Sequence, residues 1–173
     1  TNRQIAWGQV ALHVSVSDSF EEALDPNDPT HYERAGRWQS ARVESQRIAV
    51  RGRAPEPISI VVTEHGPLLR SVFPAGPRAN SLALRWTGQA ERSGVEALYR
   101  LQRCGDWSCF RAALREVRAP AATFLYSDAT GATGTQVAGD LPLRAIETGL
   151  LPLAGASRYY DWRGTADFDS LPS

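Results

Sequence analysis

Hydrophobic and polar residues alternate along several stretches of the first half of the chain, a period of two that is typical of β-strands. The clearest stretch is residues 9–17, which we predict to be a half-buried strand. Its apolar face consists of Val10, Leu12, Val14 and Val16. Further strands are predicted at residues 42–51 and 57–63, separated by a turn at 52–57, and at residues 82–86.

The hydrophobic period becomes helical after Ser93. Ser93 and Glu96 form a capping-box pattern at the start of a helix that Gly105 ends. Asp106 is expected to cap a second helix, which Pro120 ends. The apolar stripe of this second helix recurs at i, i+3, i+4 and i+7. It consists of Phe110, Ala113, Leu114 and Val117.

A hairpin follows the two helices. Residues 123–127 and 133–138 are strand-like and flank the turn sequence Asp128-Ala-Thr-Gly. The remaining residues are rich in loops and carry the aromatic residues Tyr159, Tyr160, Trp162 and Phe168. Together these patterns predict an α+β fold with antiparallel sheets and one helical pair.

The composition is that of one globular domain. The chain has 173 residues, of which 42% are hydrophobic and 22% charged, so it is long enough to bury a core. The 19 basic side chains balance the 19 acidic ones, which gives no reason to expect binding to nucleic acid. No apolar run approaches the ~20 residues of a membrane span. Because the chain has no methionine, we expect it to be part of a longer reading frame.

Few residues mark a chemical site by themselves. Cys104 and Cys109 lack the spacing of zinc ligands, and a local disulfide and two free thiols both remain open. The three histidines, His13, His31 and His65, are scattered, and no Gly-x-Ser-x-Gly pattern selects one serine for a Ser-His-Asp triad. We expect His13 to be a hydrogen-bonded structural residue, and His65, which precedes a Gly-Pro pair, to fix a turn.

Two other features bear on chemistry. Acidic side chains between Asp18 and Asp28 could ligate calcium, but the EF-hand spacing is absent and a solvated acidic loop is the simpler interpretation. An N-terminal threonine can act as a nucleophile with its own α-amine as base. For Thr1 this requires the first residue to be a natural processing terminus.

A series of short motifs, each weak alone, occurs along the chain in a characteristic order. They are Arg3-Gln-Ile-Ala-Trp-Gly, residues 32–38, Thr63-Glu-His-Gly-Pro-Leu-Leu, Leu84-Arg-Trp-Thr-Gly, Asp106-Trp-Ser-Cys-Phe-Arg-Ala-Ala-Leu, Gly149-Leu-Leu-Pro-Leu and Tyr160-Asp-Trp-Arg-Gly. In these motifs and their order the chain resembles the penicillin acylase (penicillin amidase) family of N-terminal-nucleophile hydrolases.

The resemblance implies an αββα architecture, in which two antiparallel sheets lie between helical layers. Residues 1–173 would form one partial penicillin-amidase domain. Within it, the resemblance implies core strands at 1–24, a β-rich excursion at 25–90, a helical pair at 91–118, and a hairpin with a loop-rich return to the core at 119–173.

Members of this family are exported precursors that cut themselves into two chains. The new N-terminal serine of the second chain attacks the substrate amide, with its α-amine as base. The resemblance places that serine before the Ile-Ala-Trp-Gly strand, so we expect this chain to lack the nucleophile and to be inactive alone. The implied partners are the rest of the heterodimer and a small acyl-amide substrate, with neither nucleic acid nor membrane, and the implied location is periplasmic or extracellular.

The resemblance also implies roles for individual residues. Ala11 matches a backbone N–H that binds the oxyanion of the tetrahedral intermediate, and Thr123 stands where the family has an oxyanion-binding asparagine. Arg144 matches an arginine that supports this region. Asp18 matches one calcium ligand of some members, but Ser15 stands at the other carboxylate position. No cofactor is expected for this chain, and calcium is possible in the full-length parent.

Three functions are consistent with these observations. The first is a piece of an exported acylase whose parent hydrolyses a non-peptide acyl-amide bond. The second is a degenerate homologue that serves in binding or assembly, suggested by the loss of the asparagine at Thr123. The third, an independent β-rich binding module, explains the strands but not the ordered motifs.

Overall fold

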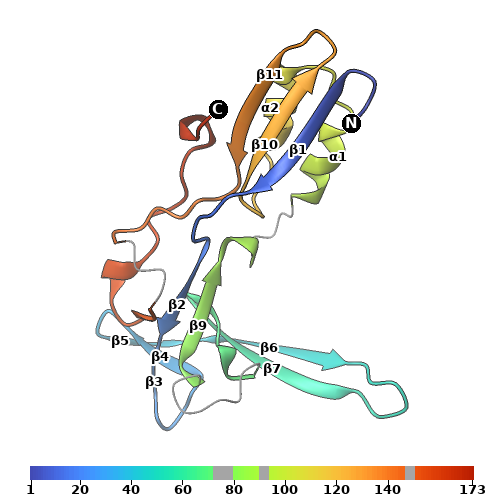
Figure 1. The fold of residues 1–173 in the computed structure, drawn as a ribbon. Coiled ribbons are helices and arrows are strands. Elements are labelled where there is room, and N and C mark those ends of the chain that lie inside the picture. The colour runs from blue at the N-terminus through green and yellow to red at the C-terminus, as the bar shows by residue number, and fades with distance from the viewer. Residues whose placement is uncertain (72–79, 90–93, 147–150) are drawn as a thin grey trace. The chain divides into compact units, whose positions relative to one another are not determined.

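The computed structural model describes residues 1–71, 80–89, 94–146 and 151–173 (Figure 1). The chain folds into two compact units, each assembled from separate stretches of sequence. Unit 1 consists of Thr1–Val16, Thr87–Leu143 and Trp162–Ser173, and unit 2 consists of Ser17–Trp86 and Arg144–Asp161. In the described residues, strand pairing is antiparallel apart from one short parallel pair. The predicted α+β class is therefore confirmed.

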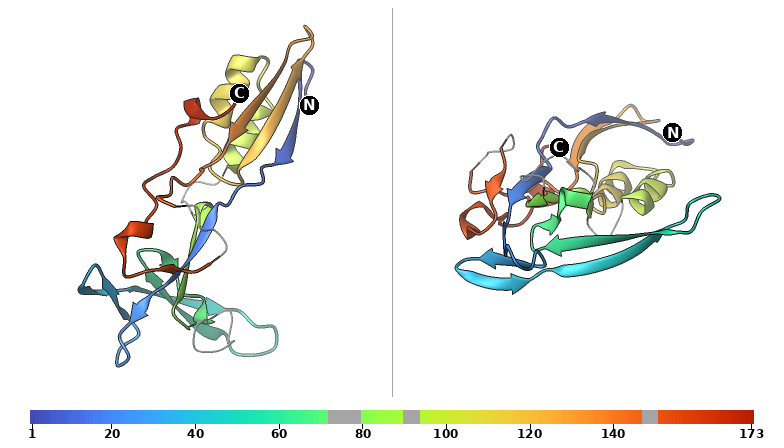
Figure 2. Two further views of the ribbon diagram at one scale, coloured as in Figure 1. Left: turned by 60° about the vertical axis from the view of Figure 1, so that its left-hand side comes forward. Right: turned by 90° about the horizontal axis from the view of Figure 1, so that it is seen from below.

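Unit 1 is an antiparallel sheet with two helices against one face (Figures 1 and 2). The sheet has the order β1 (Ile5–Ala11), β10 (Ala122–Asp128), β11 (Thr133–Ala138). Strands β10 and β11 are the predicted hairpin. Alternate residues of β10 from Ala122 to Tyr126 are buried in the core beneath the helices, as the period of two requires. These buried residues are Ala122, Phe124 and Tyr126.

The helical pair consists of α1 (Val95–Leu101) and α2 (Trp107–Leu114). Asp106 caps α2 as predicted, because its side chain accepts a hydrogen bond from the Cys109 N–H at 2.8 Å. The predicted apolar stripe of α2 is buried at every position, including Val117, which lies beyond the end of the helix. Ser93 of the expected capping box lies outside the described residues.

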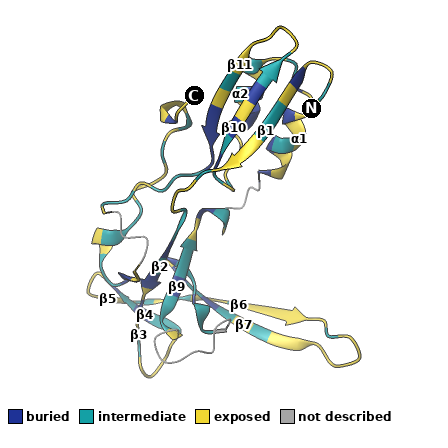
Figure 3. Cartoon of the chain, viewed as in Figure 1, coloured by how far each residue is buried: buried dark blue, intermediate teal, exposed yellow. Residues whose placement is uncertain are grey.

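Unit 2 consists of small sheets with the strand orders β12-β2-β9, β3-β4-β5 and β6-β7-β8. Their strands are β2 (Ser17–Glu21), β3 (Ala23–Leu24), β4 (His31–Arg34), β5 (Arg37–Ser40), β6 (Arg42–Ile48), β7 (Glu56–Thr63), β8 (Gly66–Pro67), β9 (Leu82–Trp86) and β12 (Leu153–Ala154). The strands predicted at 42–51, 57–63 and 82–86 are confirmed as β6, β7 and β9. Strand β6 is exposed along most of its length (Figure 3).

Short 3₁₀ helices lie in the connections. They span Leu69–Ser71, Thr87–Gln89, Arg158–Tyr160 and Phe168–Ser170. No helix among the described residues is long and apolar enough to cross a membrane. The division of the chain into segments 1–24, 25–90, 91–118 and 119–173 of one domain stays a prediction.

The strand predicted at residues 9–17 is wrong. Strand β1 ends at Ala11 and β2 begins at Ser17. Between them lies a tight turn, in which the N–H of Val14 donates to the carbonyl of Leu12 at 2.9 Å. The predicted apolar face is not buried, since Val10 is 53% exposed. The alternation continues from a strand that pairs with β10 into one that pairs with β9. Periodicity cannot show where one strand stops and the next begins.

Candidate functional site

The two expected oxyanion donors lie on neighbouring strands of unit 1. In the β1–β10 pair, Val10 is opposite Thr123 and Ala11 is opposite Ala122. Directly opposed residues in an antiparallel pair have Cα atoms about 4.5–5.5 Å apart. Ala11 on β1 therefore lies opposite the residue next to Thr123 on β10. The structure brings these two predicted residues together.

The Thr123 side chain lies on the face of the sheet opposite the helices. Its strand neighbours Ala122 and Phe124 are both 0% exposed in the core under the helices, and successive side chains of a strand point to opposite faces. Val10 shares the face of Thr123 and is exposed, as is Ala11. Within unit 1, this end of the strand pair is accessible to a reactant.

Arg144 and Asp18 form a buried ion pair in unit 2. The distance from Arg144 Nε to Asp18 Oδ2 is 2.7 Å, and the side chains are 9% and 2% exposed. Breaking a buried ion pair by removing one partner typically costs about 3–5 kcal/mol. Arg144 thus contacts Asp18, and its support of the Thr123 region stays a prediction.

The same ion pair bears on the expected calcium ligand. Asp18 already accepts a hydrogen bond from a guanidinium, and Ser15 supplies no carboxylate. Among the described residues there is no group of three or more His, Cys, Asp or Glu side chains that could hold a metal ion. Asp18 and Ser15 by themselves do not make up a calcium site, because calcium takes 6–8 oxygen ligands. A calcium ion held with ligands from the rest of the parent stays a prediction.

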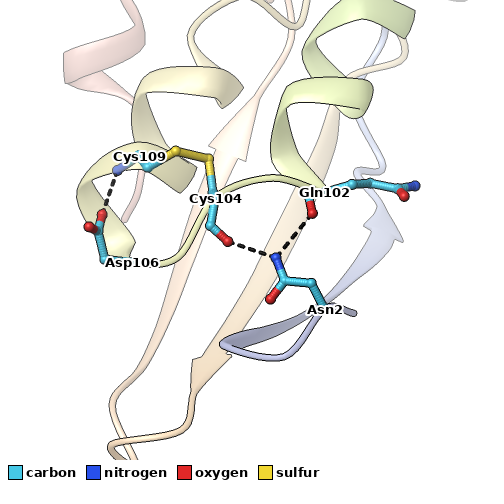
Figure 4. Close-up of a disulfide and its surroundings, with 5 residues drawn as sticks. All are labelled: Asn2, Gln102, Cys104, Asp106 and Cys109. Atoms are coloured by element: carbon cyan, nitrogen blue, oxygen red, sulfur yellow. Dashed lines mark hydrogen bonds between the residues drawn. A yellow bond between two sulfur atoms is a disulfide. The ribbon is translucent and has the colours of Figure 1, made fainter.

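The two cysteines form a disulfide between the helices of unit 1 (Figure 4). This decides between the two possibilities that the sequence left open. The Cα atoms of Cys104 and Cys109 are 5.3 Å apart, within the usual range for a bridge. Beside it, the Asn2 amide donates to the backbone carbonyls of Cys104 (2.7 Å) and Gln102 (3.1 Å), so that the start of β1 is held against the turn between α1 and α2.

Comparison with known proteins identifies the family of the chain. The model of the penicillin amidase family matches residues 1–173. The chain belongs to the penicillin amidase family. It is 32% identical to an acyl-homoserine lactone acylase QuiP of Pseudomonas fluorescens (strain Pf-5) over 168 residues, which are 96% of this chain and 21% of that protein. It is 31% identical to the penicillin acylase 2 proenzyme of Pseudomonas sp. (strain SE83), over 99% of this chain and 22% of the proenzyme.

The fold agrees with a solved structure of the penicillin amidase family. A thermostable penicillin G acylase from Alcaligenes faecalis superimposes with a TM-score of 0.82 and 25% identity, over 99% of this chain and 31% of that one. The chain spans about a fifth of the length of the curated relatives that it matches. The family and the fold of the chain are therefore established.

Unit 2 of this penicillin amidase chain contains a buried ionic cluster that no sequence pattern predicted. His65 is 1% exposed. Its Nδ1 is 2.9 Å from Glu22 Oε1, and its Nε2 is 3.1 Å from Asp161 Oδ1. The ring of Phe20 stacks on the imidazole at a centroid distance of 3.8 Å. Because both ring nitrogens face carboxylates, the imidazole cannot take a proton from a hydroxyl nucleophile. The cluster has a structural role: His65 joins Glu22 to Asp161 and does more than fix a turn, the role expected of it.

Arg34 completes this cluster from β4. Its guanidinium pairs with Asp161, lies 3.0 Å from Glu64 Oε2 and donates to the Gly155 carbonyl at 3.1 Å. The hydrogen bond from Arg34 lowers the pKa of Glu64. Its partners lie 30 to 127 residues away in sequence. No local pattern could reveal such contacts, although the Thr-Glu-His-Gly-Pro motif marks the turn that carries His65.

Proposed function

We propose that this chain is part of an amidohydrolase that cleaves the bond between an acyl group and an amine. The N-terminal serine nucleophile is supplied from outside these residues. The names of the relatives, acyl-homoserine lactone acylase and penicillin acylase, support this reaction class. The observation that supports the proposal most directly is the β1–β10 register, in which Ala11 lies opposite Ala122, the neighbour of Thr123.

In this proposal the strand pair stabilises the negative oxygen of the tetrahedral intermediate. The backbone N–H of Ala11 and the hydroxyl of Thr123 donate hydrogen bonds to that oxygen. Donors fixed before the reaction are effective because they need no reorganisation when the charge develops, and losing one costs about 10²–10³ in rate. A threonine hydroxyl is shorter than an asparagine amide, so the substrate carbonyl must lie closer to β10 than it would for asparagine.

The test removes the Thr123 hydroxyl while keeping the shape of the side chain. In the full-length protein, Thr123→Val is expected to lower kcat for a chromogenic acyl amide by about 10²–10³. Thr123→Ser keeps the donor and is expected to retain most of the activity. The measurement is steady-state kinetics with phenylacetyl and fatty-acyl amides.

Thr135→Val is the matched control for this test. Thr135 lies on β11 and is exposed, so its replacement removes a hydroxyl of the same sheet away from β1. Its kcat should equal that of the unmodified protein. Equal activity of the Thr123→Val and Thr135→Val proteins would exclude Thr123 as an oxyanion donor.

The alternative is a degenerate homologue that serves in binding or assembly, and the threonine at position 123 is what favours it. The two proposals differ in the residue at the self-cleavage junction upstream of Thr1. A serine there supports the amidohydrolase, and any other residue supports the degenerate homologue. Thr123→Asn adds a second criterion, because restoring the family residue should raise activity only if the nucleophile is present.

The parent is proposed to be periplasmic or extracellular and to assemble from further acylase segments. The Cys104–Cys109 disulfide supports an oxidising compartment. Two exposed apolar residues, Val10 (53%) and Leu125 (44%), lie on the sheet face of unit 1 opposite the helices, which supports a covering partner. A test is to purify the parent from the periplasm or medium and to identify its chains by mass spectrometry.

A further inference from the structure

An exposed Ser–His–Asp arrangement lies on the β3-β4-β5 sheet of unit 2. His31 of β4 and Ser40 of β5 are direct cross-strand partners. The distance from Ser40 Oγ to His31 Nε2 is 3.0 Å, and the distance from His31 Nδ1 to Asp28 Oδ2 is also 3.0 Å. These are the two contacts, on the two different ring nitrogens, that a serine nucleophile, a histidine base and an orienting carboxylate require.

The carboxylate of this group is held in place by its own turn. Thr30 donates to Asp28 Oδ1 through its hydroxyl (2.6 Å) and its N–H (2.9 Å). The N–H of His31 donates to the backbone carbonyl of Asp28 at 2.9 Å. The Thr30 hydrogen bonds lower the pKa of Asp28, so this carboxylate is ionised at neutral pH and acts only as an acceptor.

An ionised Asp28 fixes the proton on the imidazole of His31. Nδ1 must carry the proton that it donates to the carboxylate, which leaves Nε2 of the neutral ring unprotonated and able to accept from the Ser40 hydroxyl. This is the tautomer that a general base needs. Trp38, two residues before Ser40 on the same face of β5, is 57% exposed. Its ring therefore offers an apolar surface on the face of the sheet that carries the hydroxyl.

We propose that Ser40, His31 and Asp28 form a second acyl-transfer site, with Ser40 as its nucleophile. Ser40 Oγ attacks the carbonyl carbon of an ester while His31 Nε2 takes the hydroxyl proton. The bond from that carbon to the leaving oxygen then breaks, and the leaving alcohol receives the proton from the imidazolium. The product is an ester of the acyl group with Ser40, which water hydrolyses to the free acid and the original hydroxyl.

The openness of the site limits its substrates to activated esters. All three side chains lie at the surface, with His31 40% and Asp28 50% exposed, so water rather than fixed donors solvates the developing oxyanion. The loss of fixed oxyanion donors costs about 10²–10³ in rate per donor. Amides need that stabilisation more than phenyl esters do, because their leaving groups are poorer. Ser40 is therefore acylated by aryl esters of small acids, and the exposed Trp38 on the same face of β5 offers an apolar surface to the aryl group.

Acetylation by p-nitrophenyl acetate tests the proposal on the full-length protein. After short exposure the protein is quenched in acid, cleaved with trypsin and analysed by mass spectrometry. Cleavage after Arg37, Arg42 and Arg47 places Ser40 and Ser45 on separate peptides, residues 38–42 and 43–47. Ser45 is an exposed strand serine and serves as the internal reference. Ser40 is expected to acetylate about 100-fold faster than Ser45, the contribution of a general base.

Two variants show whether the histidine and the carboxylate act on Ser40. His31→Asn is expected to reduce acetylation of Ser40 to the rate of Ser45. Asp28→Asn removes the negative charge that holds the proton on Nδ1 and is expected to lower the rate about tenfold or more. Equal acetylation of the two serines in the unmodified protein would refute the proposal, as would a Ser40 rate that neither variant changes. Acetylation of the proposed N-terminal serine nucleophile maps to a peptide outside this chain, so the two proposals succeed or fail separately.

Discussion

Single polar side chains join segments of this chain that lie far apart in sequence, and Asn2 is the clearest case. Its amide donates to the Gln102 and Cys104 carbonyls, and its Oδ1 accepts from the Gln4 and Ile5 N–H groups at 2.8 and 2.9 Å. The side-chain amide nitrogen and oxygen of Asn2 therefore both hold the start of β1 against the turn between α1 and α2.

Asn2→Ala should loosen the start of β1. Each hydrogen bond contributes about 0.5–1.5 kcal/mol net, so losing these four should lower the local free energy of opening by about 2–6 kcal/mol. The measurement is amide hydrogen exchange at Gln4 and Ile5, which should become at least about tenfold faster, since about 1.4 kcal/mol is a factor of ten. Asn27→Ala, at an exposed turn position, is the control. Unchanged exchange at both amides would contradict the role of Asn2.

At the scale of elements, α2 holds the 3₁₀ helix Phe168–Ser170 through two arginines. Arg111 and Arg115 both pair with the carboxylate of Asp169 (2.9 and 2.7 Å). Their guanidinium carbons lie 5.0 and 4.7 Å from the centre of the Phe168 ring, within the range of cation–π contacts. Charge and packing therefore act on the same two neighbouring residues.

This contact predicts a titration. Hydrogen bonds from Arg115 and Arg111 lower the pKa of Asp169 to about 2. Because the folded-state value lies below the ordinary value of about 3.9, the interaction stabilises the fold above about pH 4 and is lost as the pH falls through about 2. Carbon NMR of the Asp169 carboxyl should show this midpoint. Arg115→Gln should raise it, whereas Arg118→Gln, whose partner is Asp140, should not.

Helices and strands could be predicted where the residues that specify them are close together in sequence. The buried stripe of α2, its Asp106 cap and the β10–β11 hairpin each depend on residues within a few positions of one another, and the structure confirms them. The strand predicted at 9–17 failed because alternation continues across the boundary between two strands with different partners. The Ser40–His31 contact was not foreseen either, because it depends on a cross-strand register that neither residue type announces.

The candidate site shows the same division at the scale of the whole molecule. Ala11 and Thr123 were selected by resemblance to a family rather than by any pattern in their own surroundings, and the β1–β10 register then placed them side by side. Arg144 and Asp18 were selected for separate roles, yet they pair with each other. Motif order thus indicates which residues to examine, whereas the contacts between distant segments decide what each one touches.

The last prediction concerns residues 1–173 expressed alone. Two hydrogen-bond donors can stabilise an oxyanion only after a nucleophile has attacked, and in the proposed mechanism that nucleophile is a serine outside this chain. Chromogenic phenylacetyl or fatty-acyl amides should therefore give no turnover above buffer, although aryl esters should still label Ser40. The decisive comparison is with Thr1→Ala. Amide turnover that survives purification and disappears in this variant would show that Thr1, with its own α-amine as base, is the nucleophile.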